Sequence, residues 1–369
     1  MTVQSSDYRV RYLERTLAGR YAFRRWVGEG GFAAVYEVEH VPSGRREALK
    51  ILLRDHRDEQ VFARRFEREA RLAASLDHPN IVSIHEYGDA HGIFWYSMPF
   101  IEGASLASVL ARGPLAWWEA VALALPIVDA LHHCHVRGVV HRDVKPENVL
   151  VGTDGEPHLM DFGLAKSAQD PDLTRKGLLV GTPAYVAPEQ LAGTGVDGRA
   201  DLYAVGVMLY EMVSGGLPFV ADGSTKALLA RLEQEPTPIA ERVVGIAPSL
   251  AQAIHTALAR EPAARFADAA TMRAALAELL PHDGDAESRR RAAVRARVEA
   301  ARDAPAPDES RCSTTGTLTI ADSPVAAHRG NRRPVVAVAL TAIGGLLAAR
   351  LVAALRESRA ARAQPRREP

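Results

Sequence analysis

The stretch HRDVKPEN, residues 141–148, is the part of the sequence that decides how the rest of the chain is interpreted. It contains the carboxylate of Asp143 and, within five residues of it, an ammonium and an amide. Two further motifs follow in order: DFG begins 18 residues after Asp143 at Asp161, and APE ends 28 residues after Asp161 at Glu189. One tripeptide would carry little information, but an ordered series at these spacings indicates a single functional site.

A glycine-rich segment, GEGGFAAV at residues 28–35, lies upstream between two predicted strands, Tyr21–Val27 and Ala34–Glu39. Glycines let a hairpin backbone approach phosphates closely and point its amides at them, although tight hairpins also use glycine for turn geometry alone. A strand follows this segment, where a dinucleotide-binding fold would place a helix, so the pattern disfavours that fold.

Lys50 lies in a third predicted strand, Glu47–Leu53, among apolar residues. A helix is predicted over about Glu59–Leu76, and Glu69 falls in the middle of its apolar stripe. An acid that faces a core needs a cation. The pattern therefore predicts a Lys50–Glu69 ion pair.

Taken together, these motifs resemble those of protein kinases, specifically the eukaryotic-like (Hanks-type) bacterial Ser/Thr kinases. The resemblance covers residues 20–281 and implies an α+β, two-lobed fold, with a β-rich N-lobe over 20–98 and an α-helical C-lobe over 99–281. It implies transfer of the γ-phosphate of ATP to Ser or Thr hydroxyls of proteins. The position of Lys145, two residues after Asp143, and the GTPAY segment at 181–185 resemble the Ser/Thr-specific pattern.

The resemblance assigns roles to the central residues. Asp143 would accept the substrate's proton, and Lys145 would steady the transferring phosphoryl group. Asn148 and Asp161 offer hard oxygen ligands that suit Mg²⁺. Lys50 would hold the α- and β-phosphates of ATP with Glu69 behind it. The ATP-binding lid would consist of Gly28, Glu29, Gly30, Gly31, Phe32, Ala33, Ala34 and Val35.

The sequence departs from the family pattern at Ala33, where a third loop glycine is usual. Its methyl group is expected to restrict the tip of the loop and affect loop mobility more than nucleotide binding. The resemblance also places Met98 at the gatekeeper position, with the carbonyl of Pro99 and the amide of Ile101 as partners for adenine.

Regulatory and structural residues also follow from the resemblance. Arg142 would pair with a phosphate on the activation segment, and Thr174 is the best-placed acceptor for that phosphate. Glu189 and Arg265 would form a buried ion pair of the large lobe, and Asp201 would tie the catalytic loop to the central helix.

The composition supports a folded chain with distinct ends. The 369 residues carry 45 basic and 45 acidic side chains, which gives no case for nucleic acid as a partner. Residues 281–369 hold 16 Arg and 10 acids and so carry a net charge of +6. Because the whole chain is neutral, residues 1–280 carry a net charge of −6. Two cysteines, Cys134 and Cys312, make a disulfide framework implausible and favour a reducing, cytoplasmic compartment for the kinase domain.

The flanking regions are interpreted by composition. Residues 1–19 form an N-terminal extension, and 282–333 an Ala/Arg/Pro-rich, disordered linker with room for a short helix near Ser288–Arg302. Residues 335–355 are long and apolar enough for a single transmembrane helix in the cytoplasmic membrane, although Arg350 makes insertion into the bilayer less favourable. An Ala-rich helix that packs on the domain or lies at an interface is the alternative. The basic tail, 356–369, would then face anionic lipid.

Two other functions are alternatives to an active protein kinase. A catalytically silent, kinase-like scaffold or nucleotide sensor would lack the base, a metal ligand or the lysine, and all of these residue types are present. A small-molecule kinase is disfavoured by the long activation segment that ends in Ala187-Pro188-Glu189.

Overall fold

The computed structural model describes residues 8–30, 33–52, 59–162, 183–193, 195–219, 234–280 and 284–303. The part of the predicted linker after residue 303 and the predicted segments 335–355 and 356–369 therefore lie outside the described residues. Within those ranges, no helix is long and apolar enough to cross a membrane.

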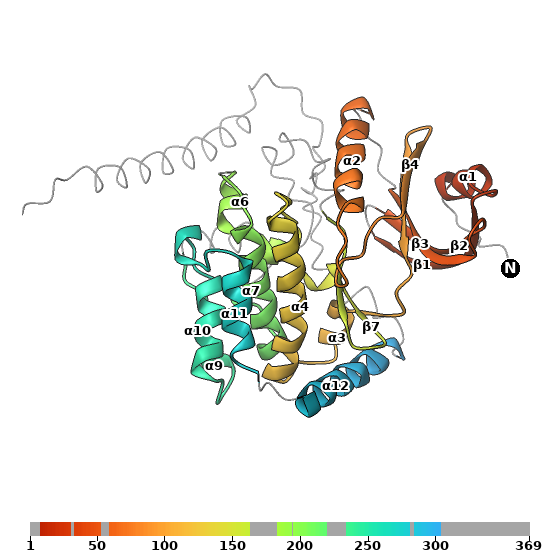
Figure 1. Cartoon of the computed structure of the whole chain (residues 1–369). Helices are drawn as coiled ribbons and strands as arrows, with labels where there is room; N and C mark the ends of the chain where they lie inside the picture. Colours follow the sequence, from red (N-terminus) through yellow and green to blue (C-terminus); the bar gives the residue numbers. More distant parts are fainter. Residues whose placement is uncertain are drawn as a thin grey trace, which may run out of the picture. The chain divides into compact units, whose positions relative to one another are not determined.

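The first part of the chain forms a five-stranded antiparallel sheet (Figure 1). Its strand order is β1-β2-β3-β5-β4, and the three strands expected from the sequence are confirmed, with bounds that differ by a few residues. The strands are β1 Tyr21–Gly30, β2 Ala33–His40, β3 Arg45–Leu52, β4 Glu86–Ala90 and β5 Ile93–Pro99.

The two faces of this sheet are covered by different helices because successive side chains of a strand point to opposite faces. On β3, Leu52 belongs to the core cluster that includes Phe66 of α2 Glu59–Ala74. Its neighbour Ile51 belongs to a second cluster, with α1 Tyr8–Thr16. The small lobe therefore has two apolar cores, one on each side of the sheet.

Helix α1 is a difference from the sequence interpretation, which treated residues 1–19 only as an extension. Val10 and Leu13 are buried on the outer face of the sheet, and Leu17 follows them there. They cover Tyr36 and Trp95, which would otherwise face water. The reason is burial: this face of the sheet is apolar, and burying each of these side chains contributes roughly 1.5–3 kcal/mol.

Replacing Leu13 with Ala is therefore expected to lower the free energy of unfolding by about 2–5 kcal/mol. Leu13 is fully buried, and its removal leaves a cavity between α1 and the sheet. Urea denaturation of the full chain measures the effect. Leu72→Ala, the same change at an exposed position of α2, is the matched control and should cost less than about 0.5 kcal/mol. Equal costs for the two variants would show that α1 does not contribute to the small lobe.

The large lobe is mainly helical (Figure 1). Helix α7 forms its centre: its side chains from Ala200 to Leu209 are buried all round, as expected of a core helix. A small sheet, β6-β7-β8, lies at the start of the lobe. The described elements are β6 Gly103–Ser105, α3 Leu106–Leu110, α4 Trp117–His135, β7 Val149–Gly152, β8 Pro157–Leu159, α6 Pro188–Ala192, α7 Arg199–Ser214, α9 Ile239–Arg242, α10 Pro248–Ala257 and α11 Ala269–Ala277.

One more helix, α12 Gly284–Arg302, begins inside the segment interpreted as a linker. Val298 is fully buried against the large lobe, and Arg291 pairs with Glu156 at 3.0 Å. Gly155, at φ 85°, lets the β7–β8 turn approach this helix closely, because a Cβ there would lie 3.1 Å from the Arg291 carbonyl oxygen. The short helix expected near Ser288–Arg302 is therefore confirmed, and it packs as part of the folded lobe.

Candidate active site

The loop that holds the central motif is fixed to α7 by one buried carboxylate. Asp201 accepts the backbone N–H groups of His141 and Arg142, each at 2.8 Å, and lies 2.8 Å from the ring of His135 on α4. Its side chain is almost fully buried. Arg142 has a φ of 65°, which is unusual for a residue with a side chain, and these bonds hold it there. The expectation that Asp201 ties the catalytic loop to the central helix is confirmed.

Three of the predicted site residues meet within this loop. The ammonium of Lys145 lies 3.2 Å from Oδ2 of Asp143. The amide nitrogen of Asn148 donates to the same oxygen at 3.0 Å and to the Asp143 carbonyl at 2.8 Å. Because its nitrogen is engaged in this way, the amide oxygen of Asn148 is the atom left for a cation. A short 3-10 turn over Pro146–Asn148 provides the reversal that brings them together.

His141 links this loop to the DFG motif. Its ring lies 3.0 Å from the carbonyl oxygen of Met160 and 4.6 Å, centroid to centroid, from the ring of Phe162. Burial lowers the pKa of His141 despite the nearby carboxylate of Asp201, so the ring is kept neutral. His141 therefore serves packing and positioning.

Asp161 lies where the small lobe meets this loop. Its φ of 62° is again unusual for a side-chain-bearing residue, and its carboxylate contacts two strands of the small lobe. Oδ2 lies 2.5 Å from the ammonium of Lys50 on β3, and Oδ1 accepts the hydroxyl of Tyr96 on β5 at 2.7 Å. Burial alone would raise the pKa of Asp161, but Lys50 and the two hydrogen bonds lower it, so the group is a carboxylate.

The predicted Lys50–Glu69 pair is wrong for this structure. The carboxylate partner of Lys50 is Asp161, and Glu69 lies half-buried on α2. Helical periodicity correctly placed Glu69 on the inward side of α2, but it does not fix how far that side lies from β3. The carboxylate of Asp161, by contrast, reaches Lys50 on β3 directly.

The glycine-rich segment is mostly strand. The hairpin pairs Gly28 with Val35, Glu29 with Ala34 and Gly30 with Ala33, and residues 31–32, the Gly31 and Phe32 of the predicted lid, lie outside the described residues. Ala33 is the first residue of β2, directly after residues 31–32, and its expected effect on loop mobility stays a prediction. Ala33 is buried and belongs to the larger of the two core clusters.

The segment after β5 begins at the expected place. Met98 is buried, opposite Ala48 on β3, and Pro99 is the last residue of the strand. Ile101 is half-buried, two residues further on. Arg46 stacks 4.4 Å above the ring of Phe100 and so packs this connection against β3. The assignment of Pro99 and Ile101 to adenine stays a prediction. The role of Thr174 also stays a prediction, because Thr174, like Gly163 of the DFG motif, lies outside the described residues.

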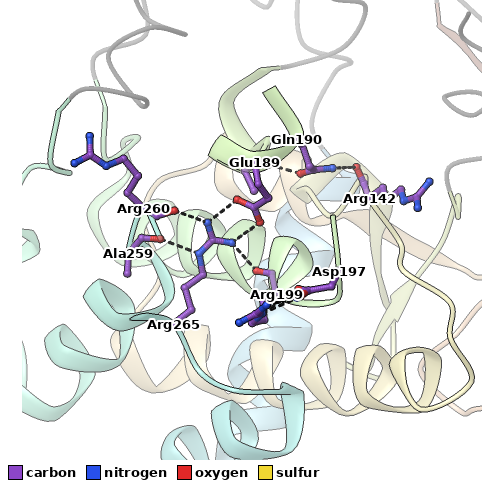
Figure 2. Close-up of polar contacts among 9 residues, drawn as sticks. Arg142, Glu189, Gln190, Asp197, Arg199, Ala259, Arg260 and Arg265 are labelled. Carbon is purple, nitrogen blue, oxygen red and sulfur yellow. Dashed lines mark hydrogen bonds and ion pairs between the residues drawn. The ribbon is translucent and has the colours of Figure 1, made fainter. Parts of the chain in front are cut away.

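A second buried ion pair lies in the large lobe (Figure 2). Both terminal nitrogens of Arg265 lie 2.7 Å from the oxygens of Glu189, and the Arg265 side chain is fully buried. This confirms the predicted pair. Next to Glu189, Gln190 donates to the carbonyl oxygen of Arg142 at 3.2 Å, so α6 also contacts the catalytic loop.

Tyr96 is the site residue that the sequence interpretation missed. It lies directly opposite Lys50 in the β3–β5 register and two residues before Met98, so period-two alternation puts both on the face of Lys50. The signal available in the sequence was a residue with a hydroxyl group, Tyr96, at a strand position that faces the same side as Lys50. Its contact with Asp161, 65 residues away, was not visible in the sequence.

Comparison with known proteins agrees with this geometry. The protein kinase domain family matches residues 21–278, and the chain belongs to that family. It is 42% identical over 253 residues to serine/threonine-protein kinase PknD of Mycobacterium tuberculosis, covering 68% of this chain and 38% of the relative. Against serine/threonine-protein kinase PrkC of Bacillus subtilis it is 37% identical over 262 residues, covering 70% and 40%.

Among solved structures, the PknI kinase domain of Mycobacterium tuberculosis superposes with a TM-score of 0.58 at 30% identity. The match covers 71% of this chain and 96% of that domain. The two-lobed kinase fold expected from the sequence is therefore confirmed. The chain spans only about two fifths of the length of these two curated relatives.

Proposed function

We propose that this chain is a Ser/Thr protein kinase that transfers the γ-phosphate of ATP to hydroxyl groups of proteins. The observation that carries the proposal is two sets of contacts. Asp143 contacts Lys145 and Asn148, and Asp161 contacts Lys50. Phosphoryl transfer depends mainly on positioning and on neutralising phosphate charge, and this site supplies a base, two ammonium groups and oxygen donors.

Asp143 is the proposed base. The carboxylate of Asp143 would orient the incoming Ser or Thr hydroxyl and accept its proton as the new bond forms. Lys145, already 3.2 Å from that carboxylate, is placed to contact the phosphoryl group at the same point. Lys50 would bind the α- and β-phosphates in exchange for part of its contact with Asp161.

The oxygen donors fit Mg²⁺. Asn148 presents an amide oxygen and Asp161 an ionised carboxylate, both hard ligands. The described residues contain no cluster of three or more His, Cys, Asp or Glu side chains able to hold a metal by themselves. That fits a cation held by one or two protein oxygens together with the phosphates, whose charge it would neutralise when bound.

A transfer assay tests the function. Purified full-length chain is incubated with ATP labelled at the γ-phosphate, a generic protein substrate and Mg²⁺, and the labelled amino acids are identified after hydrolysis. Phosphoserine and phosphothreonine support the proposal, with autophosphorylation at Thr174 among the sites to be mapped. Nucleotide binding without any transfer would instead identify a kinase-like sensor or scaffold.

We also propose that residues 335–355 anchor the chain in the cytoplasmic membrane and leave the kinase domain in the cytoplasm. The support is the length and apolarity of this segment and the arginines on both sides of it. We expect the full chain to sediment with membranes and to need detergent for release, while a chain that ends at residue 333 stays in the supernatant. Equal solubility of both would refute the anchor.

A further inference from the structure

Tyr96 shares the carboxylate of Asp161 with Lys50. The phenol hydroxyl binds Oδ1 at 2.7 Å and the ammonium binds Oδ2 at 2.5 Å, so each oxygen is held by one side chain of the small lobe. The two side chains come from neighbouring strands, where Lys50 and Tyr96 are directly paired. The Tyr96–Asp161 bond therefore connects the small sheet to the DFG motif of the large lobe.

Packing explains the ring of Tyr96 but not its hydroxyl. The ring is 2% exposed, lies 6.5 Å from the ring of Phe66 on α2 and 5.9 Å below the ammonium of Lys50. Phenylalanine would fill the same space. A buried hydroxyl costs free energy unless it is hydrogen-bonded, and the acceptor here is Asp161. Burial, and then the charge of Asp161, raise the pKa of Tyr96, so the phenol stays protonated as a donor.

We propose that Tyr96 is a positioning residue for Mg²⁺ binding: its hydroxyl holds the carboxylate of Asp161 in the orientation that receives the cation. This inference rests on the proposed function. Each carboxylate oxygen has two lone pairs, so the bond to Tyr96 leaves Oδ1 able to bind a cation as well. When Lys50 turns to the phosphates, Tyr96 is the small-lobe side chain that keeps Asp161 in place.

Outer hydrogen-bond partners of metal ligands typically contribute 10–100-fold to metal affinity, because they fix the ligand before the metal arrives. Tyr96 is placed to act as such a partner, because its hydroxyl binds Oδ1 of Asp161 from the small lobe at 2.7 Å. Loss of the hydroxyl should therefore weaken the Mg²⁺-dependent part of nucleotide binding and spare the part that depends on the adenine and the lysine.

The test measures ADP affinity of the full chain by calorimetry, once with Mg²⁺ and once with EDTA. The ratio of the two dissociation constants is the Mg²⁺ enhancement. We expect Tyr96→Phe to lower this enhancement about 10-fold and to leave the affinity in EDTA unchanged. Tyr87→Phe is the matched control. Tyr87 pairs with Tyr96 across β4 and β5, and its hydroxyl oxygen accepts a hydrogen bond from Arg71, away from Asp161. This variant should keep the full enhancement.

Three results would overturn the role of Tyr96. An enhancement that Tyr96→Phe leaves unchanged or increases would show that the hydroxyl does not help to place the metal ligand. An equal loss of ADP affinity with and without Mg²⁺ would show a general structural role. Absence of any Mg²⁺ enhancement in the unaltered chain would refute the proposed function itself, and this inference with it.

Discussion

Replacing Asp143 with Asn is expected to reduce phosphoryl transfer about 10²–10⁴-fold, the usual contribution of a positioned base. Asparagine has nearly the same shape and keeps an oxygen that can accept the Asn148 amide, which lies 3.0 Å from Oδ2 in the present site. It cannot take the substrate's proton, and it loses the charge that pairs with Lys145. The change therefore removes the chemistry of the residue with little effect on the fold.

The measurement is single-turnover transfer to a protein substrate, together with the affinity for Mg·ADP. Because Asp143 is not among the nucleotide-holding groups of the proposed site, nucleotide affinity should stay near that of the unaltered chain. Asp89→Asn is the matched control. Asp89 is an exposed residue near the end of β4, and it accepts the backbone N–H of Gly92, which asparagine can also bind. A transfer rate that survives Asp143→Asn would remove Asp143 from the mechanism.

The parts of the site that could be predicted from sequence are those built from consecutive residues. Asp143, Lys145 and Asn148 lie within six positions, and a proline-initiated turn leaves them few ways to be arranged. The strands were equally accessible, because short apolar segments bounded by turn residues indicate strands. The resemblance to a known family then supplied the distant partners Asp201, Glu189 and Arg265.

Contacts set by tertiary distance were not accessible in the same way. Helical periodicity gave the inward position of Glu69, but whether Lys50 meets Glu69 or Asp161 depends on the spacing between α2, β3 and the DFG motif. The bond from Tyr96 to Asp161 likewise joins residues from two lobes. The sequence places α1 in an extension and α12, expected as a short helix near Ser288–Arg302, in a linker, because both segments are polar overall. Only a few of their residues, such as Leu13 and Val298, are buried, and burial of these few is sufficient for docking.

The Glu189–Arg265 pair uses the full hydrogen-bonding capacity of the arginine. Arg265 binds both oxygens of Glu189 and also donates to the backbone carbonyls of Ala259, Arg199 and Arg260 at 2.8–3.0 Å (Figure 2). All five N–H donors of the guanidinium are thereby satisfied. The cation also lies 4.8 Å from the ring of Tyr203 on α7. Lysine, with a single ammonium, could not reproduce this arrangement.

Removing one partner of such a pair leaves an uncompensated charge in the interior, which typically costs about 3–5 kcal/mol. We therefore expect Arg265→Met to lower the free energy of unfolding by about that amount, measured by urea denaturation of the full chain. Glu189→Met combined with Arg265→Met should be less destabilised than Arg265→Met alone, because the stranded carboxylate is removed too. It should not return to the stability of the unaltered chain, because three backbone carbonyls have lost their donor.

An exposed ion pair serves as the control, because it shows how much of the expected loss comes from burial of the pair and how much from the loss of an ion pair alone. Arg24 and Glu39 form an ion pair on the β1–β2 surface, where both side chains are more than a third exposed. Arg24→Met should cost at most about 1 kcal/mol, since solvent screens an exposed pair. If Arg265→Met costs no more than Arg24→Met, the buried pair does not stabilise the lobe. If it costs several times more, the buried pair stabilises the part of the lobe that holds α6. Gln190 of α6 binds the carbonyl of Arg142, which precedes the proposed base Asp143.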